Sequence, residues 1–321
     1  MRLTALVALV ALVALASVPS VSAQEPREAP DSLVTPTGTL HATLALPEGD
    51  GPFPVVLILA GSGGTDRDGN GGGMRPDTYR LLAQALAERG VATLRTDKRG
   101  IGESAGADVD SLTFGLYADD AAAWLRRLQD DGRFSAVVAG GHSEGAHLAS
   151  LAATDAGADG LVLLAGAVEP LVETLRWQLA DRLPETFVGP ALAMLDSVEA
   201  GRVATGLPPP LDAVFSGANQ RYLISTLSYD PVRDFAAFDG PALVVLGSTD
   251  LQVLPENAER FRAARPAAEV VVVEGMNHVL RDAAGDLAAQ APSYTSPDLP
   301  LTAEAVARVT AFVQAVGRGG R

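Results

Sequence analysis

Ser143 lies between two glycines in the stretch "GGHSEGAHLA", which follows an apolar run and precedes a segment rich in small residues. A sharp strand-to-helix turn lifts a central serine hydroxyl clear of a sheet, and it needs small residues two positions before and after the serine. Gly141 and Gly145 meet this need, and the turn would also point the amide of Glu144 at the same space. The pattern is the G-x-S-x-G nucleophile elbow and predicts Ser143 as a nucleophile. The alternative is a glycine-rich turn in which Ser143 only caps a helix.

A serine hydroxyl needs a base to take its proton, and the chain has four histidines. His278, in "EGMNHVL", follows a predicted strand. Ligand-facing loops lie at the carboxyl ends of parallel strands, where Ser143 also lies. We therefore predict His278 as the base rather than as a surface-loop histidine. Structural roles are expected for His41 in an early strand, for His142 in the turn itself, and for His147, which we expect to face away from the nucleophile.

The base needs a carboxylate that fixes its tautomer and stabilises the imidazolium. Asp250 ends a predicted strand in "VVLGSTDLQV", again at a carboxyl end. Two other acids are less well placed, because Asp239 precedes its strand and Glu256 is expected in the first turn of a helix. We therefore predict Asp250 as the acid that orients His278.

Acyl transfer also requires two amides that hold a negative oxygen. The stretch "LILAGSGGTDRDGNGGG" places a glycine-rich loop after an apolar strand. We predict that the amide of Ser62, or less favourably Gly63, joins that of Glu144 in an oxyanion hole. A phosphate-binding loop is the alternative, but the stretch lacks the G-K-[ST] ending of a P-loop. The acids Asp66 and Asp68 would also repel phosphate.

Apolar runs and helical periodicities alternate along most of the chain. Strands are predicted at 39–47, 52–60, 91–97, 135–141, 160–166, 241–250 and 268–275, and helices at 78–90, 117–129, 145–157, 256–264 and 302–316. Continuous apolar runs indicate strands buried on both faces. The alternation predicts an α/β fold with a mostly parallel central sheet and helices on both faces.

The alternation stops between 167 and 235, where the pattern is helical with proline breaks. About 70 residues is long for a crossover connection. We therefore predict an inserted helical cap between core segments 39–166 and 236–321; ordinary crossover helices are the alternative. The cap supplies candidates for a substrate pocket, or for its own packing core: Trp177, Phe187, Met194, Phe215, Tyr222 and Leu223.

The first residues have the pattern of an export signal. Arg2 precedes an apolar run that ends before Pro19, and small residues favour cleavage after Ala23. An uncleaved anchor helix is the alternative, but a spanning helix needs about 20 apolar residues. We predict a signal peptide at 1–23, a flexible lead-in at 24–38, a secreted or periplasmic protein, and no stable membrane anchor after cleavage.

The charge and the cysteine content exclude several classes of partner. The chain has 321 residues and a net charge of −15, so nucleic acid and anionic membranes are unfavourable partners. It has no cysteine, which excludes disulfides and thiolate metal sites. We expect no metal and no cofactor.

Together these motifs resemble the α/β-hydrolase superfamily, in particular bacterial serine esterases of the dienelactone-hydrolase-like and acyl-esterase kind. The resemblance covers the chain from about residue 39 to the end. Four stretches carry it: "LAGSGGTDRDGN", "TDKRGIGES", "GGHSEGAHLA" and the pair "GSTD" and "GMNH". The order Ser143, Asp250, His278 matches the order of triad members in that family. The resemblance implies that Ser143 is the nucleophile, His278 the base and Asp250 the orienting acid.

Two features of the resemblance concern the oxyanion loop. The loop "DKRGIGES" is expected to support it structurally, through an Asp97–Arg99 ion pair. Many relatives carry His-Gly ahead of the oxyanion residue, whereas Ala60 and Gly61 stand there in this chain. The backbone amide does the chemistry, so the change affects the anchoring of the loop and not its donor.

These residues predict a serine hydrolase that cleaves the carboxylic ester bonds of small acyl or aryl esters through an acyl-enzyme intermediate. An apolar pocket would favour such small-molecule esters over highly charged substrates. A peptidase, amidase or thioesterase could use the same triad. A non-catalytic binding module on the same fold is a third alternative, because function must be inferred from the site and not from the fold.

Overall fold

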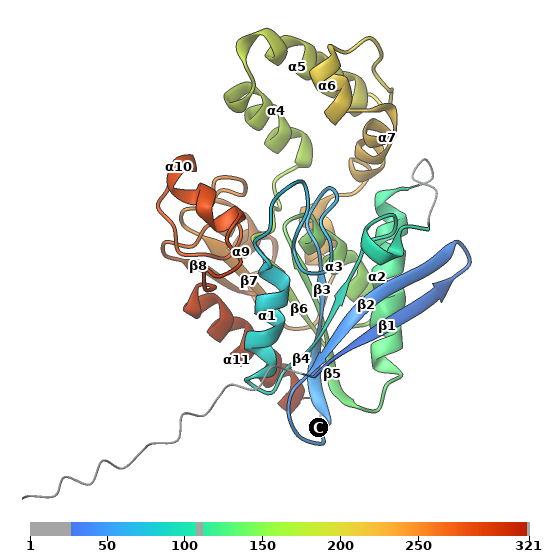
Figure 1. The fold of residues 1–321 in the computed structure, drawn as a ribbon, viewed down its shortest axis with the longest axis vertical. Helices are drawn as coiled ribbons and strands as arrows, with labels where there is room; N and C mark the ends of the chain where they lie inside the picture. The colour runs from blue at the N-terminus through green and yellow to red at the C-terminus, as the bar shows by residue number, and fades with distance from the viewer. Residues whose placement is uncertain (1–26, 107–111, 320–321) are drawn as a thin grey trace, which may run out of the picture.

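The computed structural model describes residues 27–106 and 112–319 and places an eight-stranded sheet within them (Figure 1). The strand order is β1-β2-β4-β3-β5-β6-β7-β8. From β4 onward in this order the neighbours are parallel, whereas β2 pairs antiparallel with both β1 and β4. The strands are β1 (Arg27–Thr35), β2 (Gly38–Leu46), β3 (Phe53–Leu59), β4 (Ala92–Thr96), β5 (Phe134–His142), β6 (Gly160–Leu164), β7 (Ala242–Gly247) and β8 (Glu269–Val273).

Helices cover both faces of the sheet, which confirms the predicted α/β class. On one face lie α1 (Thr78–Ala87) and α11 (Ala303–Gly319). On the other lie α2 (Phe114–Gln129), α3 (Glu144–Ala156), α8 (Pro231–Ala236) and α9 (Asn257–Ala264). The interior strands β6 and β7 are buried along their whole length because helices pack on both of their faces. The predicted elements agree with the observed bounds to within about three residues, the usual scatter of helix and strand ends.

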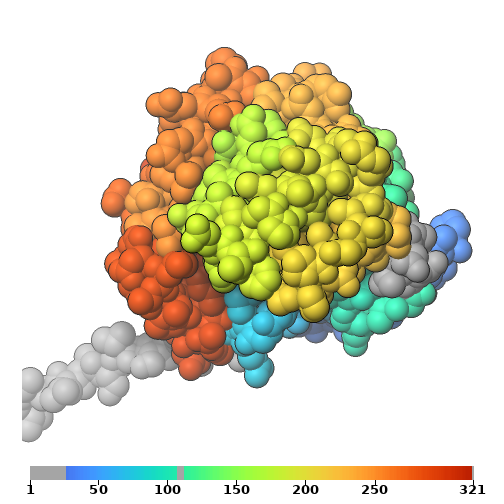
Figure 2. All heavy atoms as spheres, turned by 90° about the horizontal axis from the view of Figure 1, so that it is seen from above, coloured from blue at the N-terminus to red at the C-terminus, as the bar shows by residue number. Residues whose placement is uncertain are grey.

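Four helices, which we call the cap helices, lie above the carboxyl ends of the parallel strands (Figure 1). They are α4 (Leu171–Arg182), α5 (Glu185–Glu199), α6 (Pro209–Val214) and α7 (Gly217–Thr226). Seen from above, these yellow-green to yellow segments cover the centre of the molecule (Figure 2). They have a small apolar cluster of their own, built on Leu179, Ala191, Leu195 and Leu211. A short helix, α10 (Leu287–Gln290), lies beyond β8.

The segment expected to be a flexible lead-in is ordered over most of its described part. Residues 27–35 form β1, which pairs with β2 along its whole length. β1 lies at the edge of the sheet, and Pro30 is tolerated there because an edge strand has unpaired amide positions. Leu33 packs against the core, so the strand is held by a long-range contact that its polar sequence does not reveal.

The predicted signal peptide at 1–23 lies outside the described residues, as do residues 24–26 of the lead-in. Over residues 27–106 and 112–319, no helix combines the length and the hydropathy that a bilayer crossing requires.

Candidate active site

Ser143 occupies a strained turn between β5 and α3. Its φ is 55° and its ψ is −122°, a conformation that few residues other than glycine adopt. Only glycine fits at the two flanking positions, because a Cβ would be too close to the neighbouring backbone. A Cβ on Gly141 would overlap the carbonyl oxygen of Gly145, and a Cβ on Gly145 would lie 2.7 Å from the carbonyl oxygen of Ala60. The structure therefore has the strand, turn and helix that the G-x-S-x-G pattern requires.

Asp250 and His278 are hydrogen-bonded to each other at the carboxyl ends of neighbouring strands. The Nδ1 atom of His278 lies 2.8 Å from Oδ2 of Asp250, which is 2% exposed. The other carboxylate oxygen accepts hydrogen bonds from the amides of Gln252 and Val253 at 2.7 and 3.0 Å. Because the carboxylate can only accept, His278 carries its proton on Nδ1 and leaves Nε2 as an acceptor. The competing acids Asp239 and Glu256 are both exposed.

His142, the residue before Ser143, connects the turn to the loop that carries His278. Its Nε2–H donates to the carbonyl oxygen of His278 at 2.7 Å, and the two imidazole rings are 4.8 Å apart between centres. Its Nδ1 accepts from the hydroxyl of Tyr79 at 2.8 Å. Burial, together with the nearby His278, lowers the pKa of His142 to about 3. His142 is therefore neutral near pH 7 and ties the His278 loop to the end of β5, directly before Ser143.

The glycine-rich loop after β3 approaches Ser143 closely. A Cβ on Gly61 would lie 3.2 Å from the Cβ of Ser143. The amide of Gly61 donates to the Tyr79 hydroxyl at 3.1 Å, so Tyr79 of α1 anchors this loop. Ser62, Ser143 and Glu144 line one cavity. Glu144 is the first residue of α3, and the first amides of a helix have no intrahelical acceptor, so the amide of Glu144 is available to a ligand.

This cavity, of about 1010 Å³, lies between the sheet and the cap helices. Apolar side chains from α4 and α7, including Leu171, Leu175 and Leu223, form much of its upper wall. Of the cap residues proposed for a pocket, Phe215, Tyr222 and Leu223 line the cavity. Phe187 and Met194 pack within the cap, and Trp177 lies beneath the Arg182 guanidinium. Within the described ranges no group of three His, Cys, Asp or Glu residues is placed to hold a metal ion.

The fold that carries this site is similar to the folds of several solved structures. The structure resembles a proline iminopeptidase from Mycobacterium smegmatis with a TM-score of 0.60, 17% identity and coverage of 91% of this chain and 100% of that one. It resembles Est1E from Butyrivibrio proteoclasticus with a TM-score of 0.57, 18% identity and coverage of 89% and 99%. The chain has the α/β-hydrolase fold. The fold that the motifs predicted is thus confirmed.

By sequence, the chain is similar to esterases and to an aminopeptidase family. Residues 70–198 match the family described as Serine aminopeptidase, S33. The chain is 27% identical over 270 residues to Esterase EstD of Thermotoga maritima, a match that covers 80% of this chain and 61% of EstD. It is 41% identical over 68 residues to Esterase FrsA of Escherichia coli, covering 21% of this chain and 13% of FrsA. The chain therefore spans less than two thirds of these curated relatives, and the resemblance to bacterial esterases drawn from the motifs is confirmed at the level of sequence similarity.

The orientation expected for His147, facing away from Ser143, is wrong. Its side chain lines the same cavity as Ser143, and its Nε2 lies 2.9 Å from Oδ2 of Asp234 on α8. Phe114 packs on its ring with centres 4.9 Å apart, and burial lowers the pKa of His147. The spacing contained the signal, because residues four apart share one face of a helix. His147 therefore lies one turn beyond Ser143 on the same side of α3.

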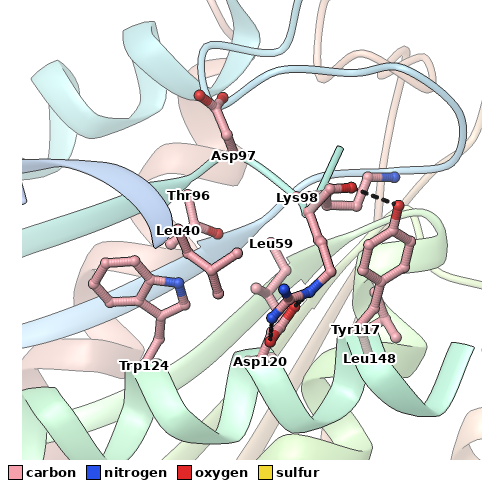
Figure 3. A pocket seen from close by; sticks show the side chains of 11 residues that line it. Leu40, Leu59, Thr96, Asp97, Lys98, Tyr117, Asp120, Trp124 and Leu148 are labelled. Carbon is pink, nitrogen blue, oxygen red and sulfur yellow. Dashed lines mark hydrogen bonds and ion pairs between the residues drawn. The ribbon is translucent and has the colours of Figure 1, made fainter. Parts of the chain in front are cut away.

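The expected Asp97–Arg99 ion pair is also wrong, because the two side chains diverge. Arg99 pairs with Asp120 of α2 at 2.5 Å, whereas Asp97 pairs with Arg67 at 2.7 Å. Figure 3 shows the Asp97 carboxylate pointing away from the Asp120 side chain. The Asp97 carboxylate also accepts from the amide of Arg67 at 2.8 Å. Asp97 therefore holds the glycine-rich loop, as expected of this segment, but through a residue of that loop.

Proposed function

We propose that this chain is a serine hydrolase that cleaves the carboxylic ester bonds of small acyl or aryl esters through an acyl-enzyme intermediate. One observation carries the proposal. A serine in a strained turn lines a large cavity, and a hydrogen-bonded His278–Asp250 pair is held against the residue that precedes this serine. Similarity to EstD supports ester bonds as the target.

In the proposed mechanism His278 works first as a base and then as an acid. Its Nε2 takes the hydroxyl proton of Ser143 as the serine oxygen attacks the ester carbonyl. The amides of Ser62 and Glu144 hold the oxyanion. His278 then protonates the leaving alcohol oxygen, and the ester C–O bond breaks. In the second half His278 takes a proton from water, the water oxygen attacks the acyl carbon, and the proton returns to Ser143 as the acid leaves.

The cavity supports the choice of small apolar acyl or aryl groups. Its upper wall is mainly aliphatic and aromatic, which favours apolar groups over highly charged ones. Est1E from Butyrivibrio proteoclasticus has a solved structure with ferulic acid, an aromatic acid, bound. We therefore propose that the acyl group enters beneath the cap helices, against Phe215 and Leu223.

A series of p-nitrophenyl esters from acetyl to dodecanoyl, measured with wild type and Ser143→Ala, tests the proposal. Wild type should turn over the shorter members, and Ser143→Ala should lose about 10⁶-fold in kcat. A fluorophosphonate should form one adduct, located on Ser143 by peptide mapping. If wild type forms no adduct and cleaves no ester, the chain is a binding module on this fold.

A peptidase or amidase is the second candidate, favoured by the match of residues 70–198 to the serine aminopeptidase family. The same triad would attack an amide or a thioester carbonyl. Aminoacyl p-nitroanilides, acyl-thioesters and the matched p-nitrophenyl esters should be compared at equal enzyme concentration. A kcat/KM for the anilide that exceeds that for the ester would assign the chain to the peptidases.

We also propose that residues 1–23 are a cleaved export signal and that the mature protein acts outside the cytoplasm. The arginine, the apolar run and the small residues before Gln24 support this proposal. Amino-terminal sequencing of protein recovered from the periplasm or the medium of an expressing bacterium should read from Gln24. Recovery of the intact amino terminus from the membrane fraction would instead indicate an anchor.

A further inference from the structure

Lys98 is unique in the composition of this chain. Of its 24 lysine and arginine residues, Lys98 alone is a lysine. The residue is 8% exposed, so its ammonium is buried rather than solvated. Burial of a charge is costly unless the charge is well paired. A chain that uses arginine everywhere else therefore places its one compact ammonium inside the protein.

The Lys98 ammonium contacts Gly61, which precedes Ser62 in the glycine-rich loop, and Glu144, whose amide is the other predicted oxyanion donor. Nζ donates to the carbonyl oxygen of Gly61 at 2.5 Å, in a hydrogen bond that its charge strengthens. It also lies 3.4 Å from Oε1 of Glu144. A third contact is the face of the Tyr117 ring, whose centre is 5.5 Å away (Figure 3). The ammonium therefore bridges the glycine-rich loop and the start of α3.

The Gly61 carbonyl and the Ser62 amide belong to one peptide unit. In a trans peptide the C=O and N–H bonds point in opposite directions. A cation fixed on the oxygen therefore directs the Ser62 N–H away from Lys98, and it polarises the unit so that the N–H becomes a stronger donor. The preceding peptide is fixed as well, because the Gly61 N–H donates to Tyr79. The peptide units before and after Gly61 are therefore both fixed by hydrogen bonds.

We propose that Lys98 is the positioning residue of the oxyanion hole, which sets the direction and the polarity of the Ser62 amide and ties it to Glu144. This inference rests on the proposed hydrolase function. It also accounts for the residue type. An ammonium is a compact point charge that can serve a carbonyl, a carboxylate and a ring face, whereas the larger planar guanidinium of arginine favours forked pairing with carboxylates.

The first test compares Lys98→Met with Arg99→Met, a matched change at the neighbouring buried cation. Arg99 binds Asp120 and Thr37, away from Gly61. Rates are expressed per site titrated with a fluorophosphonate, so that unfolded molecules do not count. Lys98→Met should lower kcat by about 10- to 100-fold with little change in KM. The Ki of a trifluoromethyl ketone, whose adduct carries an oxyanion, should rise by the same factor. Arg99→Met should lower the melting temperature but leave both per-site quantities within about twofold.

The absence of cysteine from the sequence allows a chemical rescue. In Lys98→Cys the new thiol is the only one, and in the unfolded chain its thiolate displaces bromide from 2-bromoethylamine to restore an ammonium at the length of lysine. Alkylation with 1-bromopropane gives a neutral side chain of the same length. After refolding, the aminoethylated protein should recover most of the per-site kcat, and the propylated protein should not.

A measurement on wild type covers the case in which the variants do not fold. Labelling with [6-¹³C]lysine gives a single lysine resonance, which should shift when the trifluoromethyl ketone forms its adduct. Three outcomes would each overturn the role of Lys98. They are a Lys98→Met variant with the per-site kcat and Ki of wild type, equal recovery of kcat with both alkylating agents, and a lysine resonance that does not shift. A wild type that neither cleaves esters nor forms a fluorophosphonate adduct would overturn the proposed function, and this inference with it.

Discussion

The two walls of the cavity are built in different ways. The core wall rests on a polar network beneath it, in which Tyr79, His142 and Asp250 each use their polar atoms in at least two hydrogen bonds. On the cap wall, α4 buries only Leu179, and most of the lining residues are apolar. The Tyr222 hydroxyl of α7 lies near the Glu144 carboxylate but makes no hydrogen bond of ordinary geometry within the described residues.

This difference separates two tasks. Hydrogen bonds are directional, so a fully satisfied buried network fixes the positions of its members. Apolar packing is less directional, and it mainly limits size and shape. We therefore expect core-wall substitutions to change the rate and the stability, and cap-wall substitutions to have smaller effects on both. Four substitutions test this expectation.

Asp250→Asn should have the largest effect. The amide would keep the shape of the side chain but favour the wrong tautomer of His278, and kcat should fall by about 10⁴-fold. Steady-state kinetics with a p-nitrophenyl ester measures the loss, and the exposed Asp239→Asn is the matched control. A loss below tenfold would show that the Asp250–His278 hydrogen bond at 2.8 Å does not orient the base.

Tyr79→Phe should come next. It removes a hydroxyl that accepts from the Gly61 amide and donates to His142, which leaves two buried polar groups without a partner. The expected loss is about 2 kcal/mol of unfolding free energy. Urea denaturation followed by circular dichroism measures it. An unchanged midpoint would mean that the loop and His142 are held by other contacts.

Much of this core wall could be predicted from the sequence. The apolar runs and the glycines around Ser143 are local signals, and the pairing of Asp250 with His278 follows once each residue is placed at a carboxyl end. The partners of charged side chains could not be predicted, because they are set by long-range packing. Asp97 pairs with Arg67 rather than with Arg99 for that reason. β1 was missed because its polar sequence gains order only by pairing with β2.

Two residues have sequence features that can be interpreted only with the structure. The four-residue spacing from Ser143 places His147 on the same face of α3, but facing the cavity also depends on Asp234 of α8. The single lysine is visible in the composition, yet its meaning depends on the Gly61 carbonyl 37 residues away in sequence. In both cases the sequence pattern points to the residue, and its tertiary contacts indicate its role.

The pH dependence of stability gives the third test, on the buried His142. Its pKa is about 3 in the folded protein and about 6.5 when unfolded. Between these values the unfolded chain binds a proton that the folded protein does not, so stability falls as the pH is lowered below 6.5. From pH 7 to 5 this contribution is about 2 kcal/mol. The His142→Asn variant should lose about 2 kcal/mol less unfolding free energy than wild type between pH 7 and 5, measured by urea titration. This holds even if the two proteins differ in stability at pH 7. Parallel curves for the two proteins would contradict the burial of a neutral imidazole.

Tyr222→Phe should have the smallest effect and provides the direct contrast with Tyr79→Phe. Both changes remove one oxygen from a tyrosine, which for Tyr222 lies on the cavity wall and for Tyr79 lies in the polar network beneath the core wall. Burial and the Glu144 carboxylate raise the pKa of Tyr222, so the hydroxyl stays protonated and no charge is lost. Because no hydrogen bond of ordinary geometry is broken, the unfolding free energy should change by less than about 0.5 kcal/mol in the same urea assay. A loss equal to that of Tyr79→Phe would show that the cap wall is held by polar contacts as firmly as the core wall, and size selection by apolar packing alone would then be the wrong description of this cavity.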